Sequence, residues 1–268
     1  MPFKTLIPAS RTVLCIGGLD PSGGAGISAD ARACAAFGAH CLPVATAIAV
    51  QNTRGVKFIE PIATSLIQAQ IETILDDISP SAIKIGLIPS QETAEMLADL
   101  LRAKCASIPL VIDTVFAPST GPLFSDSATI ATIADQLLPH ATVVTPNALE
   151  ARQLGADEIF DEISMKNAAR AVLARSKSKN VLLKGGHVAD PDFSVDLWFD
   201  GAEFLELRAR RENSYEVRGT GCLLASALAA QLAIGIETKT AAQNAKGWLT
   251  QKYFEAQEIG GGRRIAAI

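Results

Sequence analysis

The run Arg218-Gly219-Thr220-Gly221-Cys222 combines three features of an anion-binding site. Two glycines one residue apart let backbone N–H groups turn toward a ligand, and the alanine-rich run behind them has the length and period of a buried helix. Cys222 would lie in the first turn of that helix, an environment that lowers the pKa of a thiol from about 8.5. The sequence therefore favours Cys222 as a general base at neutral pH. The alternative is a small core residue after a glycine turn.

A second glycine-rich segment, GGLDPSGGAG, begins at Gly17 and connects an apolar strand to an alanine-rich helix. Its spacing differs from that of dinucleotide-binding loops, and no acidic residue closes a following strand at the expected place. We therefore expect a glycine-rich lip on a small-molecule pocket, where the backbone comes close to the ligand.

Polar side chains follow several of the expected strands. In open α/β sheets, ligands bind at the carboxyl ends of the strands, so Gln51 is placed to hydrogen-bond the polar edge of a ring. Asp113 suits Mg²⁺ and nucleotide phosphates, and Lys184 could reach a phosphate as a point charge. Asn147 and Glu150 share one face of a helix's first turn, where their oxygens suit a hard cation. Each residue also has a structural alternative. Gln51 could belong to a polar turn, and Lys184 could be a solvated strand end. Asp113, Asn147 and Glu150 could be helix caps.

These side chains must be positioned by strands that alternate with helices along the whole sequence. We predict one domain over residues 1–268, with a mostly parallel sheet and an antiparallel hairpin around Asp200-Gly201. Trp248 is expected to anchor the last helix in the core, and a frayed tail is expected from Gly260. The predicted strands are 12–18, 42–50, 82–87, 109–114, 141–145, 180–184, 194–199 and 203–207, and the predicted helices are 27–37, 64–78, 93–104, 164–175, a helix behind Gly221 and 239–256.

The composition excludes several classes of partner. A net charge of −4 without a basic run argues against binding nucleic acid or an anionic membrane. The longest apolar stretch, Cys222 to Ile236, is shorter than the roughly 20 residues that a bilayer span needs, and no signal peptide is evident. Five cysteines without a CxxC pair or a histidine at ligand spacing indicate neither a disulfide framework nor a zinc site. A small-molecule ligand and the reducing cytoplasm are the expectations.

The motifs GGLDPSGGAG, VQNTRG, KIG, DTV, TPNALEA, LLKGGH and GTGC occur in this order between about Val13 and Leu249. Together they resemble the hydroxymethylpyrimidine kinase / phosphomethylpyrimidine kinase branch of the ribokinase superfamily. The resemblance implies a ribokinase-like three-layer α/β/α sandwich. It also implies transfer of phosphate from ATP, with Mg²⁺, to 4-amino-5-hydroxymethyl-2-methylpyrimidine and then to its monophosphate, on the way to thiamine. Such relatives are commonly dimers, so a homodimer is expected.

The resemblance also implies residue roles. Cys222 would be the base, in a position where more distant relatives usually have Asp, and Gly219 and Gly221 would form the anion hole with it. Gln51 would bind the aminopyrimidine, Asp30 would lie close to the hydroxymethyl end of the pocket, and Gly18, Ala25 and Leu87 would also contact the substrate. The ATP phosphates would be held by Asp113, Asn147, Glu150, Lys184 and Thr220, and the first three of these would hold Mg²⁺.

Four departures from the family pattern bear on these expectations. Arg218 stands where the branch commonly has His, Leu223 where a hydroxylated residue follows the Cys, and Leu87 where Met usually follows KIG. The segment Phe116 to Gly121 lacks the usual loop lysine and is one residue shorter. The missing lysine leaves open whether the second phosphorylation and the phosphate contacts of this loop are retained, and we hypothesise that the charge of Arg218 compensates for it.

Two other functions are compatible with the same motifs. A pyridoxal or pyridoxine kinase is the nearer one, since some relatives with GTGC phosphorylate that ring as well. A non-catalytic pyrimidine-binding regulatory protein is the other, and the retained chemical groups at Cys222, Asp113 and Lys184 argue against it.

Overall fold

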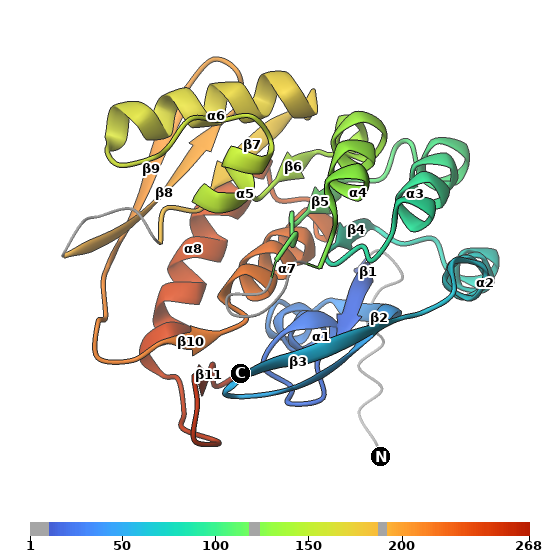
Figure 1. Cartoon of the computed structure of the whole chain (residues 1–268), viewed down its shortest axis with the longest axis horizontal. Helices are drawn as coiled ribbons and strands as arrows, with labels where there is room; N and C mark the ends of the chain where they lie inside the picture. Colours follow the sequence, from blue (N-terminus) through green and yellow to red (C-terminus); the bar gives the residue numbers. More distant parts are fainter. Residues whose placement is uncertain (1–10, 118–123, 187–191) are drawn as a thin grey trace.

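The computed structural model describes residues 11–117, 124–186 and 192–268, and shows a large sheet between two layers of helices (Figure 1). The strands are β1 Thr12–Leu19, β2 His40–Asn52, β3 Gly55–Pro61, β4 Ala82–Ile85, β5 Leu110–Ile112, β6 Val143–Val144, β7 Asn180–Leu183, β8 Phe193–Phe199, β9 Phe204–Arg210, β10 Val217–Arg218 and β11 Arg264–Ile265. The α-helices are α1 Gly26–Ala36, α2 Thr64–Asp77, α3 Gln91–Lys104, α4 Ser127–Thr132, α5 Ala148–Gln153, α6 Glu162–Ser176, α7 Thr220–Ala233 and α8 Thr238–Phe254. A π-helical turn, Ile133–Leu137, and a 3₁₀ turn, Leu138–His140, follow α4.

The nine-stranded sheet has the order β3-β2-β1-β4-β5-β6-β7-β8-β9. Its centre, from β2 to β7, is parallel, whereas β3 at one edge and β8 and β9 at the other pair antiparallel. The predicted α/β/α sandwich and the hairpin at Asp200-Gly201 are therefore confirmed. The parallel strands all end at one edge, which is where the site is assembled.

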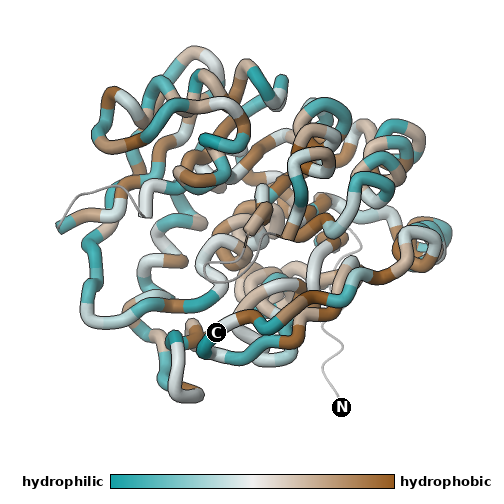
Figure 2. The backbone as a smooth tube through the Cα atoms, viewed as in Figure 1, coloured by the Kyte–Doolittle hydropathy of each residue, from teal (hydrophilic) through white to brown (hydrophobic). Residues whose placement is uncertain are grey.

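The sequence of β1 shows why the sheet is covered on both faces. Leu14 and Ile16 point into the core that contains α2, α3 and α6, while Val13 and Cys15 point into the core that contains α1, α7 and α8. Alternating side chains of one strand thus enter two cores, which is why parallel strands appear as continuous apolar runs. The hydrophobic colouring in Figure 2 is concentrated along these central elements. No helix in the described ranges combines the length and apolar character needed to cross a membrane.

Two local expectations are wrong. β2 continues through Gln51 and turns into β3, an edge strand that the sequence analysis missed because its exposed residues mix polar side chains such as Lys57 and Glu60 with Phe58. The tail after Gly260 is not frayed, since β11 pairs with β10 and Ile265 bridges to Gln257. Trp248, as expected, packs against the core that contains α7 and α8 and against Phe37, although it is only partly buried; Trp198 is the fully buried tryptophan.

Candidate active site

Two glycine-rich loops meet at the first turn of α7. Gly219 caps this helix with a φ of +73°, and a Cβ on it would lie 2.0 Å from the carbonyl oxygen of Gly24. Gly26 begins α1 with a φ of +57°, and a Cβ there would lie 2.1 Å from the carbonyl oxygen of Gly18. Glycine is required at both positions because backbone approaches backbone too closely for any side chain. The loop of the first strand is thereby held against the N-terminus of α7.

Cys222 lies in that first turn, but its thiol is not activated as the sequence suggested. Burial raises the pKa of Cys222 to about 11; Lys84 and a backbone hydrogen bond from Gly26 act in the opposite direction, and Asp30 adds to the rise. The expectation of a lowered pKa is wrong, because desolvation of the thiolate outweighs the field of the helix. In the unliganded chain Cys222 is a neutral thiol at pH 7.

The side chains of Asp113 and Lys184 meet directly beside this turn. Lys184 Nζ donates to Asp113 Oδ1 at 2.7 Å, and Thr145 Oγ1 donates to the same oxygen at 3.0 Å. A Cβ on Gly221 would lie 3.3 Å from Lys184 Nζ and 3.5 Å from Asp113 Oδ2. Burial disfavours the charged carboxylate, but Lys184 and Lys84 outweigh it and lower the pKa of Asp113. An ionised carboxylate and an ammonium group therefore flank the predicted anion site.

Asn147 and Glu150 form the capping box of α5. Glu150 N–H donates to Asn147 Oδ1 at 2.9 Å, and Asn147 N–H donates to Glu150 Oε2 at 2.8 Å. The capping alternative is therefore confirmed. The two capping hydrogen bonds still leave the side-chain oxygens of Asn147 and Glu150 able to bind a cation. Lys184 Nζ lies 3.7 Å from Glu150 Oε2, and Thr114 Oγ1 donates a hydrogen bond to the same carboxylate oxygen at 3.0 Å. Burial raises the pKa of Glu150 to about 7 despite the ion pair with Lys184.

Asp30 is not at the surface of the pocket. It is fully buried, and both of its oxygens accept from Lys84 Nζ at 2.9 Å while Ser226 Oγ donates to it at 2.7 Å. Its buried carboxylate does not face the pocket directly, but Asp30 is near enough to Cys222 to raise the pKa of that thiol, so its place close to the hydroxymethyl end of the pocket stays a prediction. Its role is to hold Lys84, whose charge acts on Cys222 and Asp113.

Lys84 was missed as a functional residue, although the signal was present. It lies in AIKIGL, an otherwise apolar strand buried on both faces, and a lysine there is rarely fully buried unless it is paired. Its Nζ lies 3.0 Å from where a Cβ on Gly86 would be, directly under the carboxyl edge of the sheet. The motif KIG therefore contains a buried, paired lysine whose charge reaches Cys222 and Asp113, as well as a glycine.

Gln51 and Arg218 lie on the other side of the first turn of α7. Arg218 Nη2 donates to Gln51 Oε1, and Arg218 Nε donates to the buried Asp20 at 3.2 Å. Since a guanidinium only donates, these contacts fix the side-chain amide of Gln51 with its NH₂ group directed away from Arg218. The charge of Arg218 is thus neutralised by Asp20, and its guanidinium is bound to Gln51. This role differs from the hypothesised one, in which Arg218 compensates for the missing loop lysine.

The remaining predicted substrate residues lie on or beside these loops. A Cβ on Gly18 would lie 3.6 Å from Leu87 Cδ1, and Ala25 lies against Gly219 at the start of α7. Contact of Gly18, Ala25, Leu87 or Gln51 with a substrate stays a prediction. The segment after Asp113 that lacks the loop lysine lies partly outside the described residues, and the N-terminal residues 1–10, for which no signal peptide is expected, lie wholly outside them.

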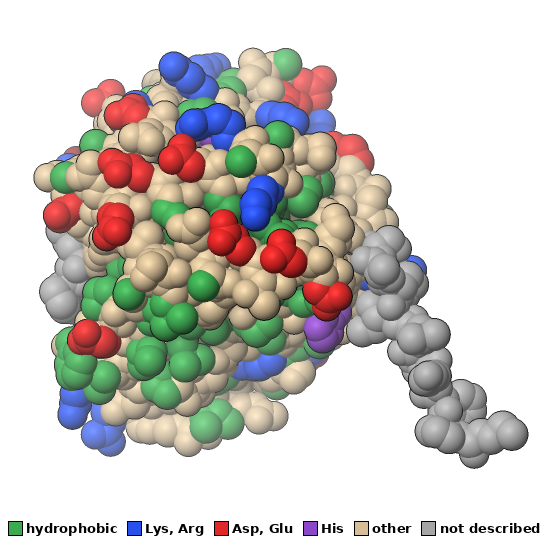
Figure 3. Space-filling model, turned by 90° about the vertical axis from the view of Figure 1, so that its right-hand side faces the viewer, with side chains coloured by type: hydrophobic (Ala, Val, Ile, Leu, Met, Phe, Trp, Pro, Cys, Tyr) green, Lys and Arg blue, Asp and Glu red, His purple; other side chains and the backbone are tan. Residues whose placement is uncertain are grey.

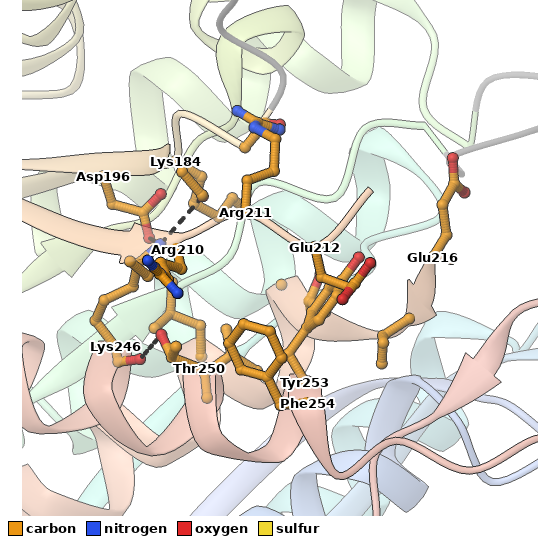
Figure 4. A pocket seen from close by; sticks show the side chains of 18 of the residues that line it. Lys184, Asp196, Arg210, Arg211, Glu212, Glu216, Lys246, Thr250, Tyr253 and Phe254 are labelled. Atoms are coloured by element: carbon orange, nitrogen blue, oxygen red, sulfur yellow. Dashed lines mark hydrogen bonds and ion pairs between the residues drawn. The ribbon is translucent and has the colours of Figure 1, made fainter. Parts of the chain in front are cut away.

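A cavity of about 620 Å³ adjoins the Asp113 and Lys184 side of this turn (Figure 4). Its lining includes Thr220, Gly221, Asn147 and Lys184. Lys246, Thr250 and Tyr253 line it from α8 (Figure 4). Lys246 Nζ lies 2.8 Å from Asp196 Oδ2 on β8. The volume and the mixed lining are those of a cofactor-sized site. Sequence reasoning missed Lys246, Thr250 and Tyr253, because polar residues that line a cavity from a helix have the same spacing as polar residues on a solvent-exposed helix face.

In this mostly parallel α/β/α sandwich, the N-terminus of α7 and Lys184 line a cofactor-sized cavity, and two carboxylates pair with that lysine; this is the arrangement of a small-molecule kinase. Comparison with known proteins specifies which one. The family model for phosphomethylpyrimidine kinase matches residues 20–266, and the chain belongs to this family.

Relatives and a solved structure agree with this assignment. The chain is 39% identical over 250 residues to a hydroxymethylpyrimidine/phosphomethylpyrimidine kinase of Streptomyces coelicolor, covering 93% of this chain and 91% of that one. It is 38% identical over 248 residues, 92% of its length, to a probable thiamine biosynthetic bifunctional enzyme of Oryza sativa, but spans only 45% of that protein. The pyridoxal kinase of Staphylococcus aureus in complex with pyridoxal superposes with a TM-score of 0.87 at 29% identity, covering 96% and 93% of the two chains.

Proposed function

We propose that this kinase transfers the terminal phosphate of ATP to 4-amino-5-hydroxymethyl-2-methylpyrimidine and then to the monophosphate. The observation that carries the proposal is the fixed amide of Gln51, whose NH₂ group is available to donate to a ring nitrogen of a neutral aminopyrimidine. The name of the Streptomyces relative supports it. ATP consumption with each pyrimidine and with pyridoxal tests it, and no turnover on any of them would favour the non-catalytic binding protein.

We propose that ATP occupies the cavity beside Lys184, with its phosphates at the first turn of α7. The backbone N–H groups around Gly219, Thr220 and Gly221 and the ammonium of Lys184 would bind the phosphates, and Cys222 would face the attacking hydroxyl. The Staphylococcus aureus pyridoxal kinase has been solved with ADP and with AMP-PCP. Positioning and charge stabilisation dominate such a transfer, so the groups on this chain are sufficient in kind.

The oxygens beside Lys184 also fit Mg²⁺. Asp113 Oδ2 and Glu150 Oε1 have no hydrogen-bond partner among the described residues, and carboxylate oxygens are ligands that this ion prefers. We therefore propose Asp113 and Glu150 as its carboxylates, with Asn147 in contact directly or through water. When bound, Mg²⁺ neutralises charge on the phosphates.

The Mg²⁺ requirement is expected to depend on pH through Glu150. Because the pKa of this carboxyl is raised to about 7, protons compete with the cation below that pH, and the Mg²⁺ activation constant should rise about tenfold per pH unit. Glu150→Gln keeps the capping box but should raise the activation constant at pH 8 at least about tenfold and remove the pH dependence. Initial rates against Mg²⁺ concentration at pH 6 to 8 measure both.

Glu162→Gln is the matched control, since Glu162 lies in the first turn of α6 but is exposed. A pH-independent activation constant in the unmodified protein would show that Glu150 is not a cation ligand.

Pyridoxal phosphorylation is a second candidate, supported by the structural similarity to the pyridoxal kinase. A pyridine with a 3-hydroxyl needs different polar partners, so Gln51→Leu should lower kcat/KM for the aminopyrimidine about 10- to 100-fold and leave any pyridoxal activity nearly unchanged. Gln51→Glu, which retains oxygens for Arg218 but lacks the NH₂ donor, should behave like Gln51→Leu. Equal losses on both rings would argue against the assigned role of Gln51.

We also propose a homodimer in the cytoplasm. The exposed apolar side chains Ile48, Val50 and Phe58 on β2 and β3 make that edge of the sheet the region proposed for the partner subunit. Figure 3 shows one face on which hydrophobic side chains gather in the lower half while charged ones dominate above.

A further inference from the structure

Three cysteines converge in the core below α1, away from the catalytic thiol. Cys15 lies on β1, Cys34 on α1 and Cys41 on β2, so they come from three consecutive elements. Their sulfur atoms all lie within 4.8 Å of one another, and Cys15 Sγ is 3.8 Å from Cys34 Sγ. Cys15 and Cys34 are fully buried, whereas Cys41 is half-buried and gives access from solvent. Spacing along the sequence does not reveal this cluster, because the fold alone brings the three together.

We propose that Cys15, Cys34 and Cys41 form a binding site for a thiophilic divalent cation such as Zn²⁺ or Cd²⁺. An ion at the centre of a sulfur triangle with edges of this size lies about 2.2 to 2.8 Å from each sulfur, which includes the Zn–S distance of about 2.3 Å. Thiolate sulfur favours soft ions over Mg²⁺, so the site is chemically distinct from the carboxylates of the active site. Water would complete the coordination, since the cluster has three members among the described residues.

The charges around the cluster favour a thiolate site. Lys84 and His40 place positive charge near the sulfur of Cys41. Three thiolates around a divalent cation carry a net charge of −1, and Lys84 is the neighbouring cation that offsets this charge. Asp30, which faces the same thiols, is already bound to Lys84.

The position of the cluster also predicts its effect. Cys15 is the register partner of Lys84 in the parallel β1–β4 pair, and Cys34 lies one helical turn after Asp30 on α1. A cation bound to all three sulfurs would join β1, α1 and β2, so it would stabilise the native state without touching the substrate pocket. The proposal does not depend on the substrate of the kinase.

Titration of the reduced full chain with Cd²⁺ tests the site. We expect one equivalent to produce the ultraviolet thiolate-to-cadmium charge-transfer band and to raise the midpoint of thermal unfolding. Cys34→Ser should weaken Cd²⁺ binding at least about tenfold and abolish the rise. Cys105→Ser, which removes a buried thiol in the opposite core, should leave both signals unchanged.

Two further variants keep the test decisive. Cys41→Ser changes the half-buried member, so it provides the same comparison if Cys34→Ser does not fold. Cys222→Ser identifies a band that arises from the catalytic thiol. The proposal is overturned if the reduced protein shows no band, if Cys34→Ser and Cys41→Ser bind Cd²⁺ as tightly as the unmodified chain, or if the band is lost only in Cys222→Ser.

Discussion

Replacing Cys222 by alanine is expected to lower kcat for phosphorylation of the pyrimidine alcohol at pH 7.5 by about 100-fold or more, with a small change in KM. The thiol lies in the first turn of α7 beside Gly221, whose neighbours are Asp113 and Lys184, so it is the group placed to accept the proton of the attacking hydroxyl. Loss of a positioned general base typically costs 10²- to 10⁴-fold. Coupled measurement of ADP release at saturating ATP and substrate gives both constants.

The raised pKa of Cys222 adds a specific pH dependence to this result. Because burial raises the pKa to about 11, only the small thiolate fraction can accept a proton near neutral pH, and that fraction increases about tenfold for each unit of pH. The kcat/KM of the unmodified protein should therefore increase with pH above 7. Cys222→Asp, which restores the carboxylate that more distant relatives carry, should retain part of the activity and lose this increase.

Cys105→Ala is the matched control for removal of a buried thiol and should leave kcat unchanged. If Cys222→Ala retains kcat within about threefold of the unmodified chain, the proton is accepted elsewhere, and Cys222 is the small core residue that its burial alone would suggest.

Much of the fold and of this site could be predicted from local patterns. Parallel strands buried on both faces appear as apolar runs, and the polar residue after such a run lies at one edge of the sheet. The resemblance placed Asp113, Asn147, Glu150 and Lys184 in one site, and the structure brings these residues together; their roles stay predictions. Two glycines within three residues likewise marked the start of α7, where a Cβ would collide with backbone.

What could not be predicted depends on contacts between distant segments. The pKa of Cys222 follows from how deeply α7 is packed, which no pattern in GTGC specifies. The ion pair of Asp30 could not be predicted because nothing in its surroundings in the sequence indicates a partner 54 positions away. The hydrogen bond between Arg218 and Gln51 and the convergence of three cysteines from β1, α1 and β2 are products of the fold in the same way.

The buried pair of Asp30 and Lys84 is expected to have the largest effect on stability. Lys84→Met leaves a carboxylate that is fully buried with Ser226 as its remaining donor, and removing one member of such a pair costs about 3–5 kcal/mol. For a chain of this size, that loss corresponds to a fall of roughly 10 °C in the midpoint of thermal unfolding. Differential scanning calorimetry and urea unfolding measure it.

A double-mutant comparison separates the charge from the packing. Lys84→Met combined with Asp30→Leu removes both charges, so it should be more stable than either single variant, although still less stable than the unmodified chain because the residues differ in shape. Activity should not recover with stability, since Cys222 and Asp113 both lose the positive charge of Lys84. If the double variant is no more stable than Lys84→Met, the cost arises from side-chain volume. If it regains full activity, Lys84 supports only the fold, and the field at Cys222 must come from Lys184 and the N-terminus of α7.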